Sequence, residues 1–189
     1  KLGNQRDAVV RQYEVYMKNT DQSTFSNANY IAMAASDKVF DGNVEVGSAG
    51  SWCTIQFTTP FNYTGSNVVV CVYDKSGKRA NGYHSFYKYS ATGRSLYSQG
   101  SSAYTVTSLT TGSSRTYVNQ IQLGMSPKPQ SITLEIGADQ NPDYSGNFYL
   151  PVYDYARYAI SQQIYTKDEI GYDGATINSV SFKIGSGSA

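Results

Sequence analysis

The stretch that most constrains the fold is residues 51–74, SWCTIQFTTPFNYTGSNVVVCVYD, in which two apolar, alternating runs flank a turn-forming segment. Alternation with a period of two is typical of strands that bury one face, and the Pro, Asn and Gly between the runs favour a turn. The pattern therefore predicts a long β-hairpin. If its strands pair symmetrically, Ile55 faces Val69, and we expect both to be buried together with Phe57.

The same pairing places Cys53 opposite Cys71. Two alternatives follow for these cysteines. A disulfide between directly opposite strand positions is geometrically demanding, whereas two buried free thiols behave as small apolar side chains. Two cysteines do not fix the redox compartment.

Length and charge restrict the class of protein. The chain has 189 residues, a natural size for one β-sandwich domain. Its 15 Lys and Arg nearly balance 14 Asp and Glu, so no strong field favours nucleic acid or an anionic membrane as a partner. No apolar run reaches the roughly 18 residues that would insert into a membrane. We expect an excised or processed segment, because residue 1 opens directly on folded-looking sequence.

The surface composition indicates a location. Charged residues make up 15% of the chain, against about 25% in an average globular protein, while the chain has 18 Tyr and 17 Gly. A polar but weakly charged surface of this kind is common in secreted β-proteins. We therefore expect an extracellular or cell-surface location.

Period-two patterns recur along the chain and predict an all-β protein. Strands are expected at residues 7–18, 38–46, 83–89, 94–98, 103–107, 115–123, 131–137, 148–153, 158–165 and 175–184. Single helical turns are expected at residues 23–27 and at 166–171, where a Thr start and a Gly stop favour a capped turn. The two prolines of residues 124–130, GMSPKPQ, predict an extended connector.

These patterns predict one domain over residues 1–189, an all-β, two-sheet antiparallel β-sandwich of jelly-roll type with at most two short helices. Within this domain, residues 124–130 are the expected joint between sequence repeats.

Several blocks of the sequence carry a resemblance to a known domain type. They are YLPVYDYARYAISQQIYTKDEIG with ATINSVSFK, RQYEVYMKNTDQSTF, DKVFDGNVEV, the 51–74 stretch and VNQIQLG. Together they resemble a repeat domain of large secreted Bacteroidetes surface proteins, related broadly to the adhesin, or haemagglutinin, regions of gingipain-type polyproteins. The resemblance implies no catalytic residue. Here the block order is circularly permuted, because the SQQIYT and TINSVSFK blocks come last instead of first.

The permutation makes a prediction about the two ends of the chain. In the unpermuted order, residues 177–184 lead by a tight turn into residues 9–17, so we expect these two strands to pair antiparallel. An unpaired edge there would invite aggregation. We expect the pairing within one chain, with strand exchange between neighbouring chains as the alternative.

Tyrosine-rich segments provide candidate binding residues for an adhesion module. Tyrosine rings stack on sugar faces and anchor protein interfaces. The candidates are Tyr83, Tyr87, Tyr89, Tyr97, Tyr104, Tyr153 and Tyr155. Their expected partners are a host or microbial glycan, or a surface protein, and neighbouring repeats. The alternative for these tyrosines is an ordinary half-buried place in a strand. The alternative function is a structural stalk or fimbria-like repeat assembled by strand complementation.

No pattern supports catalysis, so we expect no enzyme. His84, the single histidine, is accompanied by no nucleophile motif and is expected to be structural or at the surface. A glycosidase needs two carboxylates about 5–10 Å apart. The available carboxylates lie mostly in turns: Asp139, Asp143, Asp154, Asp168, Glu169 and Asp173.

One spacing suggests a metal. Asp139, Asn141 and Asp143 alternate in a polar turn, which is half of a loop-type calcium ligand set without the bidentate Glu that would complete it. A structural calcium ion is the candidate cofactor. The alternative is a hydrogen-bonded Asx turn, and no other cofactor is expected.

Overall fold

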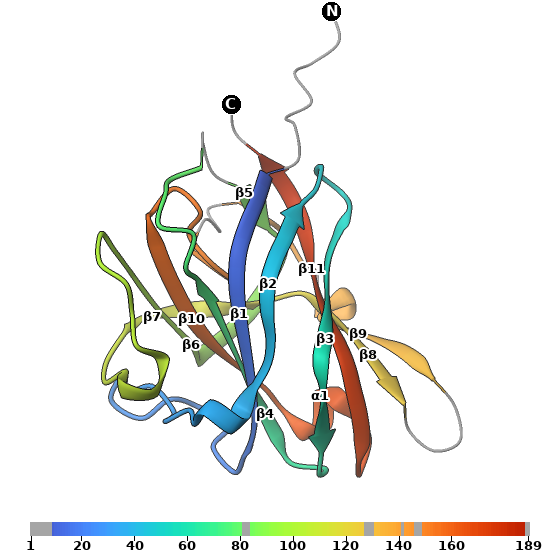
Figure 1. The fold of residues 1–189 in the computed structure, drawn as a ribbon. Coiled ribbons are helices and arrows are strands. Elements are labelled where there is room, and N and C mark those ends of the chain that lie inside the picture. Colours follow the sequence, from blue (N-terminus) through green and yellow to red (C-terminus); the bar gives the residue numbers. More distant parts are fainter. Residues whose placement is uncertain (1–8, 81–83, 127–130, 141, 146–148, 188–189) are drawn as a thin grey trace, which may run out of the picture.

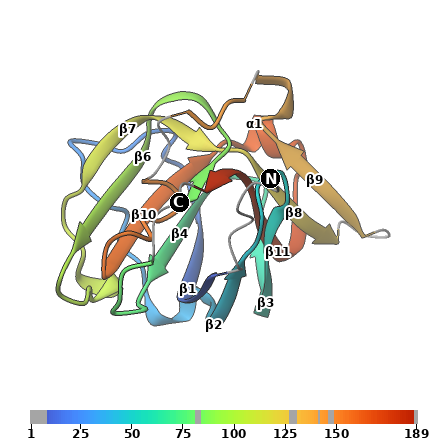
Figure 2. The same ribbon diagram turned by 90° about the horizontal axis from the view of Figure 1, so that it is seen from above.

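Two antiparallel sheets stack face to face in the computed structural model, which describes residues 9–80, 84–126, 131–140, 142–145 and 149–187 (Figure 1). The six strands of the first sheet lie in the order β2 (Lys38–Val46), β1 (Val9–Thr20), β4 (Asn67–Asp74), β10 (Tyr158–Tyr165), β6 (Lys88–Gly100) and β7 (Ser113–Asn119). The second sheet has the order β3 (Trp52–Tyr63), β11 (Ala175–Gly187), β8 (Ile121–Ser126) and β9 (Ile132–Ile136), and β5 (His84–Phe86) also pairs with β11. Figure 2 shows the two layers from above.

Helical structure is sparse in the described part of the chain. It consists of α1 (Lys167–Ile170) and the 3₁₀ turns η1 (Ala35–Asp37), η2 (Val106–Ser108) and η3 (Ala138–Gln140). The Thr166 side chain accepts a hydrogen bond from the Glu169 amide, and Gly171 ends α1 with a left-handed φ of 68°. The predicted all-β, two-sheet antiparallel sandwich and the capped turn at 166–171 are confirmed. Among the described residues, no helix has the length and apolar character to cross a bilayer.

The predicted hairpin of residues 51–74 is wrong, although both of its strands exist. β3 pairs with β11 in one sheet, whereas β4 pairs with β1 and β10 in the other. The cause is the different burial of the two runs: β3 alternates between buried and exposed residues, while seven of the eight residues of β4 are buried. A strand that is covered on both faces belongs in the middle of a sheet, and the 64–66 turn carries the chain across to the other layer.

The core between the sheets is built from the inward faces of both layers. Phe182 and Val180 of β11 pack there with Ile55 and Phe57 of β3. Val69 is buried as well but lies in a second apolar cluster, so the prediction that it packs with Ile55 and Phe57 is wrong. Cys53 and Cys71 are both buried free thiols and form no disulfide.

The second apolar cluster covers the outer face of the six-stranded sheet. Val69 and Tyr73 of β4 face outward and are covered by Phe25, Tyr30 and Met33 from the 21–37 segment. Gln162 of β10 holds this segment: its amide oxygen accepts from the Ile31 N–H and its amide nitrogen donates to the Ile31 carbonyl, both at 2.9 Å. This side-chain layer replaces the helical turn predicted at 23–27.

The predicted pairing of the terminal strands is also wrong. β1 lies between β2 and β4, and β11 lies between β3 and β8 in the other sheet. Both strands therefore have partners on each side within one chain, which satisfies their backbone groups. The alternative of strand exchange between neighbouring chains has no free edge at β1 or β11 either.

Two predicted strands divide at neighbouring crossing points. Of the strand expected at 83–89, the described residues 84–89 belong to β5 and the start of β6, which lie in different sheets. Residues 115–123 divide between β7 and β8. The Gln120 N–H donates to the Tyr87 carbonyl at 2.9 Å, so the two crossings are joined. Residues 94–98 belong to β6.

The expected strands at 103–107 and 148–153 and the expected connector at 124–130 differ from the observed structure where they are described. Residues 103–107 form no strand and include the start of η2, and residues 149–153 form no strand either. Gly124–Ser126 of the expected joint belong to β8, which pairs with β9; residues 127–130 lie outside the described residues. The assignment of this segment as an inter-repeat joint stays a prediction.

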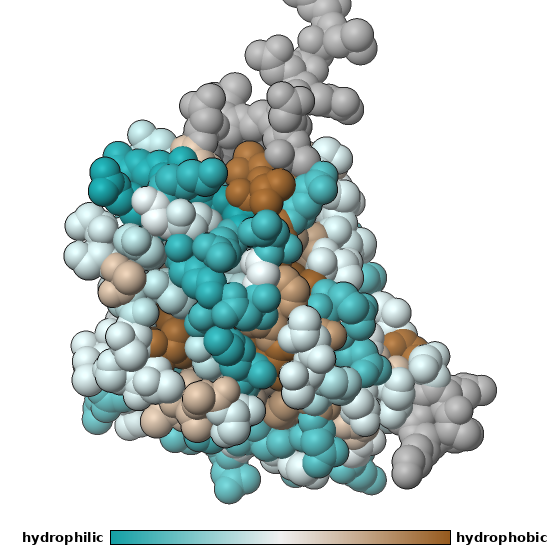
Figure 3. All heavy atoms as spheres, in the orientation of Figure 1, coloured by the Kyte–Doolittle hydropathy of each residue, from teal (hydrophilic) through white to brown (hydrophobic). Residues whose placement is uncertain are grey.

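The surface in the orientation of Figure 1 is mainly hydrophilic or neutral, and apolar residues appear only in small groups (Figure 3). Among the described residues, three large apolar side chains are more than two-fifths exposed: Val10, Tyr144 and Tyr155. Two of these three exposed side chains are tyrosines.

Candidate functional site

Four tyrosines form a continuous row, which we name the tyrosine strip: Tyr97, Tyr149, Tyr153 and Tyr155. Successive ring centroids lie 4.7, 5.3 and 6.1 Å apart along the row. Tyr97 comes from β6, and the other three come from residues 149–155, which precede β10. The distances are those of interacting aromatic pairs, so the rings support one another. Tyr155 at the end of the strip is 43% exposed.

Arginine side chains lie at both ends of the strip. The Arg115 guanidinium is 4.5 Å from the Tyr97 ring centroid and 4.0 Å from that of Tyr149, and its Nη2 donates to the Tyr97 hydroxyl at 2.7 Å. At the other end, the Arg79 guanidinium is 5.4 Å from the Tyr155 centroid. Cation–π contacts of this kind hold a ring and a guanidinium in a fixed relation.

Asp154 anchors the part of the strip that contains Tyr153 and Tyr155. Its side chain is buried and accepts hydrogen bonds from the His84 backbone N–H at 3.2 and 3.3 Å, while the His84 ring Nδ1 lies 2.6 Å from Oδ2. Tyr153 on one side of Asp154 is half-buried and packs against the core, whereas Tyr155 on the other side is exposed. His84 is therefore structural, one of the two roles expected from the sequence.

A second buried pair fastens the loop that carries Arg79. Arg11 is 1% exposed and donates through Nε to Asp74 Oδ2 at 2.8 Å. Its remaining donors reach the carbonyls of Lys78 at 2.8 Å and Ala156 at 3.4 Å. The Ala80 N–H also donates to the Asp154 carbonyl. Loops 75–80 and 153–157 are thus tied to one ionic centre.

A surface cavity of about 390 Å³ lies at the Tyr155 end of the strip. We name it the arginine pocket. The side chains that line it include Tyr153, Tyr155, Arg79, Arg157, Gln99 and Ser101. Its size is in the usual range for small-ligand pockets, and it combines aromatic faces with hydrogen-bonding groups.

The structure brings together some of the predicted tyrosines and separates others. Tyr97, Tyr153 and Tyr155 lie in the strip. Tyr104 packs against Tyr73 over the outer sheet face, and Tyr89 is buried with its hydroxyl on Glu169. Tyr87 contacts Tyr144 and the Lys183 ammonium at a separate place. Tyr83 lies outside the described residues.

Sequence reasoning missed Tyr149 and all three arginines of this site. The only signal for Arg79 was the basic segment at 75–79, which alone predicts a solvated loop. No local pattern connects it with Arg157 or Arg115, because the three come from separate parts of the chain.

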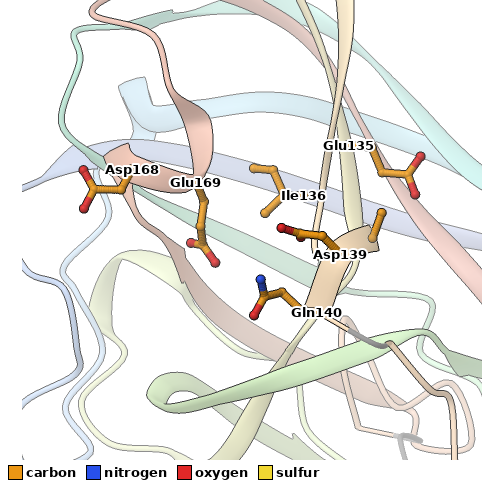
Figure 4. A pocket seen from close by; sticks show the side chains of 8 residues that line it. Glu135, Ile136, Asp139, Gln140, Asp168 and Glu169 are labelled. Carbon is orange, nitrogen blue, oxygen red and sulfur yellow. The ribbon is translucent and has the colours of Figure 1, made fainter.

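A second cavity, of about 480 Å³, is acidic and lies between α1 and the end of β9 (Figure 4). Its walls include Glu135, Asp139, Asp168 and Glu169. Figure 4 shows the carboxylates of Glu135 and Asp168 pointing in opposite directions, away from Asp139. Glu135 accepts hydrogen bonds from Gln120 and Gln122.

Glu169 is the most engaged of these carboxylates. It accepts from Arg94 Nη2 at 2.6 Å, from the Tyr89 hydroxyl at 2.7 Å and from the Thr166 N–H at 2.8 Å. Burial acts to raise the pKa of Glu169, but the hydrogen bonds from Arg94, Tyr89 and Thr166 outweigh it and hold the pKa below its ordinary value. A glycosidase acid needs the opposite shift, so Glu169 is suited to a structural role.

We expect Glu169→Gln to lower the free energy of unfolding by about 1–3 kcal/mol at pH 7, because it removes a partly buried charge that receives charged and neutral hydrogen bonds. Since its folded-state pKa is lowered, the stabilisation by Glu169 is present above its unfolded pKa and is lost as pH falls through the folded pKa. Urea unfolding at pH 7 and pH 3 should show the difference between variant and parent shrinking at the lower pH.

Asp168→Asn is the matched control for that prediction, because Asp168 lies on the same helical turn and makes no side-chain hydrogen bond within the described residues. Asp168→Asn should change the free energy of unfolding by less than about 1 kcal/mol. An equal loss for the two variants, or a pH-independent loss for Glu169→Gln, would contradict the assignment.

The residues of the predicted calcium site have other partners where they are described. The Asp143 carboxylate lies 2.8 Å from Lys88 Nζ and accepts from the Ser145 N–H at 2.7 Å, in an Asx-type arrangement. Asp139 lines the acidic cavity, and Asn141 lies outside the described residues. Across the described ranges, no group of three or more His, Cys, Asp or Glu is placed to hold a metal ion. Calcium stays a prediction, which melting with and without a chelator tests.

Fold and site together define an all-β sandwich that carries a tyrosine strip and an arginine-lined pocket beside its six-stranded sheet. No family model matches the chain, and no curated protein or solved structure matches it either. The resemblance to Bacteroidetes adhesin repeats therefore stays a prediction.

Proposed function

We propose that this chain is a non-catalytic, extracellular or cell-surface adhesion module that binds a glycan on the tyrosine strip and in the arginine pocket. The observation that carries the proposal is the continuous row of rings from Tyr97 to Tyr155, which ends beside a cavity. A sugar presents an apolar face of C–H groups and an edge of hydroxyls. Tyrosine rings match the face, and the amide of Gln99 and the hydroxyl of Ser101 can pair with the edge.

The anchoring of the site supports binding as its role. Arg115 contacts and orders Tyr97 and Tyr149. The buried Asp154, through its contact with His84, holds in place the backbone that carries Tyr153 and Tyr155. Side chains that are ordered before binding lose less conformational entropy when a ligand arrives. Such an ordered aromatic platform is well suited to the apolar C–H face of a sugar ring. The cavity of about 390 Å³ at its end has the size of a small-ligand pocket, which favours a sugar as the occupant.

Tyr155→Ala is expected to weaken glycan binding by about 10-fold or more, since it removes the exposed ring at the mouth of the pocket. A glycan array with the parent chain identifies a bound oligosaccharide, and calorimetry on that oligosaccharide then gives the Kd of each variant. Thermal melting confirms that the variants remain folded.

Tyr144→Ala is the matched control, because Tyr144 is 41% exposed, close to the 43% of Tyr155, but contacts Tyr87 outside the strip. Its Kd should equal that of the parent. Equal losses for both variants would place the binding surface elsewhere, and an array without any bound glycan would remove the proposed function.

A further inference from the structure

Two arginines of the arginine pocket have charges that the described part of the chain does not neutralise. Arg79 and Arg157 both line the cavity and both are exposed. Neither forms an ion pair with any carboxylate that the structure describes. The described residues that line the cavity include no Asp or Glu.

The other three arginines of the described chain have side-chain partners. Arg11 pairs with Asp74 at 2.7 Å, and Arg94 pairs with Glu169 at 2.6 Å. Arg115 is enclosed by Tyr97 and Tyr149 and donates to a hydroxyl. Only in the arginine pocket do two guanidinium groups border one cavity without a described carboxylate beside them.

Two like charges around one cavity repel each other, and an anion placed between them removes that cost. A guanidinium presents a planar fork of N–H donors that matches the two oxygens of a carboxylate or a sulfate. The contact between Arg79 and the Tyr155 ring restricts one of these forks. The same ring offers a face on which a sugar can lie, so an anionic group attached to a sugar satisfies both features at once.

We propose that the arginine pocket selects an acidic sugar, one that bears a carboxylate or a sulfate group, and that Arg79 and Arg157 are the residues that determine this specificity. The inference rests on the proposed glycan-binding function and adds the ligand class. The sugar ring stacks at Tyr155, the anionic group lies between the two guanidinium groups, and Gln99 and Ser101 face the remaining hydroxyls.

The test measures the Kd of the chain by calorimetry for three tetrasaccharide probes of similar length: one that contains glucuronic acid, one that is sulfated and one that is neutral. Arg79→Gln and Arg157→Gln should each weaken binding of the acidic probes by about 10-fold or more. Binding of the neutral probe should be weak and unchanged by either variant. The two acidic probes separate carboxylate from sulfate as the preferred group.

Two further variants make the result specific. Arg79→Lys keeps the charge but removes the fork, and it should recover only part of the affinity. Lys167→Gln removes one exposed positive charge on α1, away from the lining of the arginine pocket, and should leave all three Kd values unchanged. An equal loss in Lys167→Gln would show that general charge, not the pocket, sets the affinity, and would overturn the inference.

The failure of this inference can be told apart from the failure of the proposed function. If the neutral probe binds as tightly as the acidic ones and the arginine variants change nothing, the acidic specificity is wrong while glycan binding stands. If none of the probes and no oligosaccharide of the array binds, both proposals are wrong.

Discussion

Phe182→Ala is expected to lower the free energy of unfolding by about 3–5 kcal/mol. Phe182 is 1% exposed and lies in β11, where its neighbours in register are Cys53 of β3 and Ile121 of β8. Its ring fills the core between the two sheets. Truncation removes apolar contacts on several sides and leaves a cavity that backbone strands cannot easily close.

Chemical denaturation of the parent and the variant measures this loss. Thr176→Ser, at an exposed position of the same strand, is the control and should change stability by less than about 1 kcal/mol. A loss below about 1 kcal/mol for Phe182→Ala would mean that the core is not packed around β11.

Asp74→Ala has the second large expected effect, a loss of about 3–5 kcal/mol. Arg11 and Asp74 are 1% and 0% exposed, and removal of the carboxylate leaves the Arg11 guanidinium buried without its counter-charge. Two hydrogen bonds from Ser76, from its N–H at 3.0 Å and its hydroxyl at 2.5 Å, are lost at the same time. Urea unfolding at pH 7 measures the change.

The double variant Arg11→Met with Asp74→Leu separates the burial of an uncompensated charge from the loss of the pair. Since it removes both charges, its loss of stability should be smaller, by at least about 1 kcal/mol, than the summed losses of the single variants Arg11→Met and Asp74→Leu. Strict additivity would show that the two side chains do not act as a pair. Because Arg11 also holds the carbonyls of Lys78 and Ala156, the double variant should still bind glycan more weakly than the parent.

Strand positions could be predicted from the sequence because alternation is a local property. The 38–46 and 158–165 runs were located closely, and Thr166 with Gly171 delimits α1 through chemistry that lies within six residues. Pairing partners were predicted wrongly at residues 51–74 and at the two ends. A partner depends on which faces of a strand are covered, and for β4 the outer cover comes from the distant 21–37 segment.

In the candidate site, too, local features could be predicted from the sequence, whereas contacts between distant residues could not. Tyr97, Tyr153 and Tyr155 could be singled out because tyrosine-rich runs are visible in the sequence. Arg79 and Arg157 could not be connected, since the ties between their loops run through the buried Arg11 and Asp154. Asp154 itself stood in an aromatic run as one of several turn carboxylates, and only its contact with His84 reveals its role.

The central place of β11 has a consequence for how the protein is made. Among the described strands β11 is synthesised last, yet it lies between β3 and β8 and also pairs with β5. Before β11 is synthesised, the second sheet lacks the strand that pairs with both β3 and β8. Those two strands are then not hydrogen-bonded through a common partner, and their apolar inner faces are exposed. Nascent chains that stop before residue 175 should therefore engage chaperones, and protease resistance should appear only once residues 175–187 have left the ribosome.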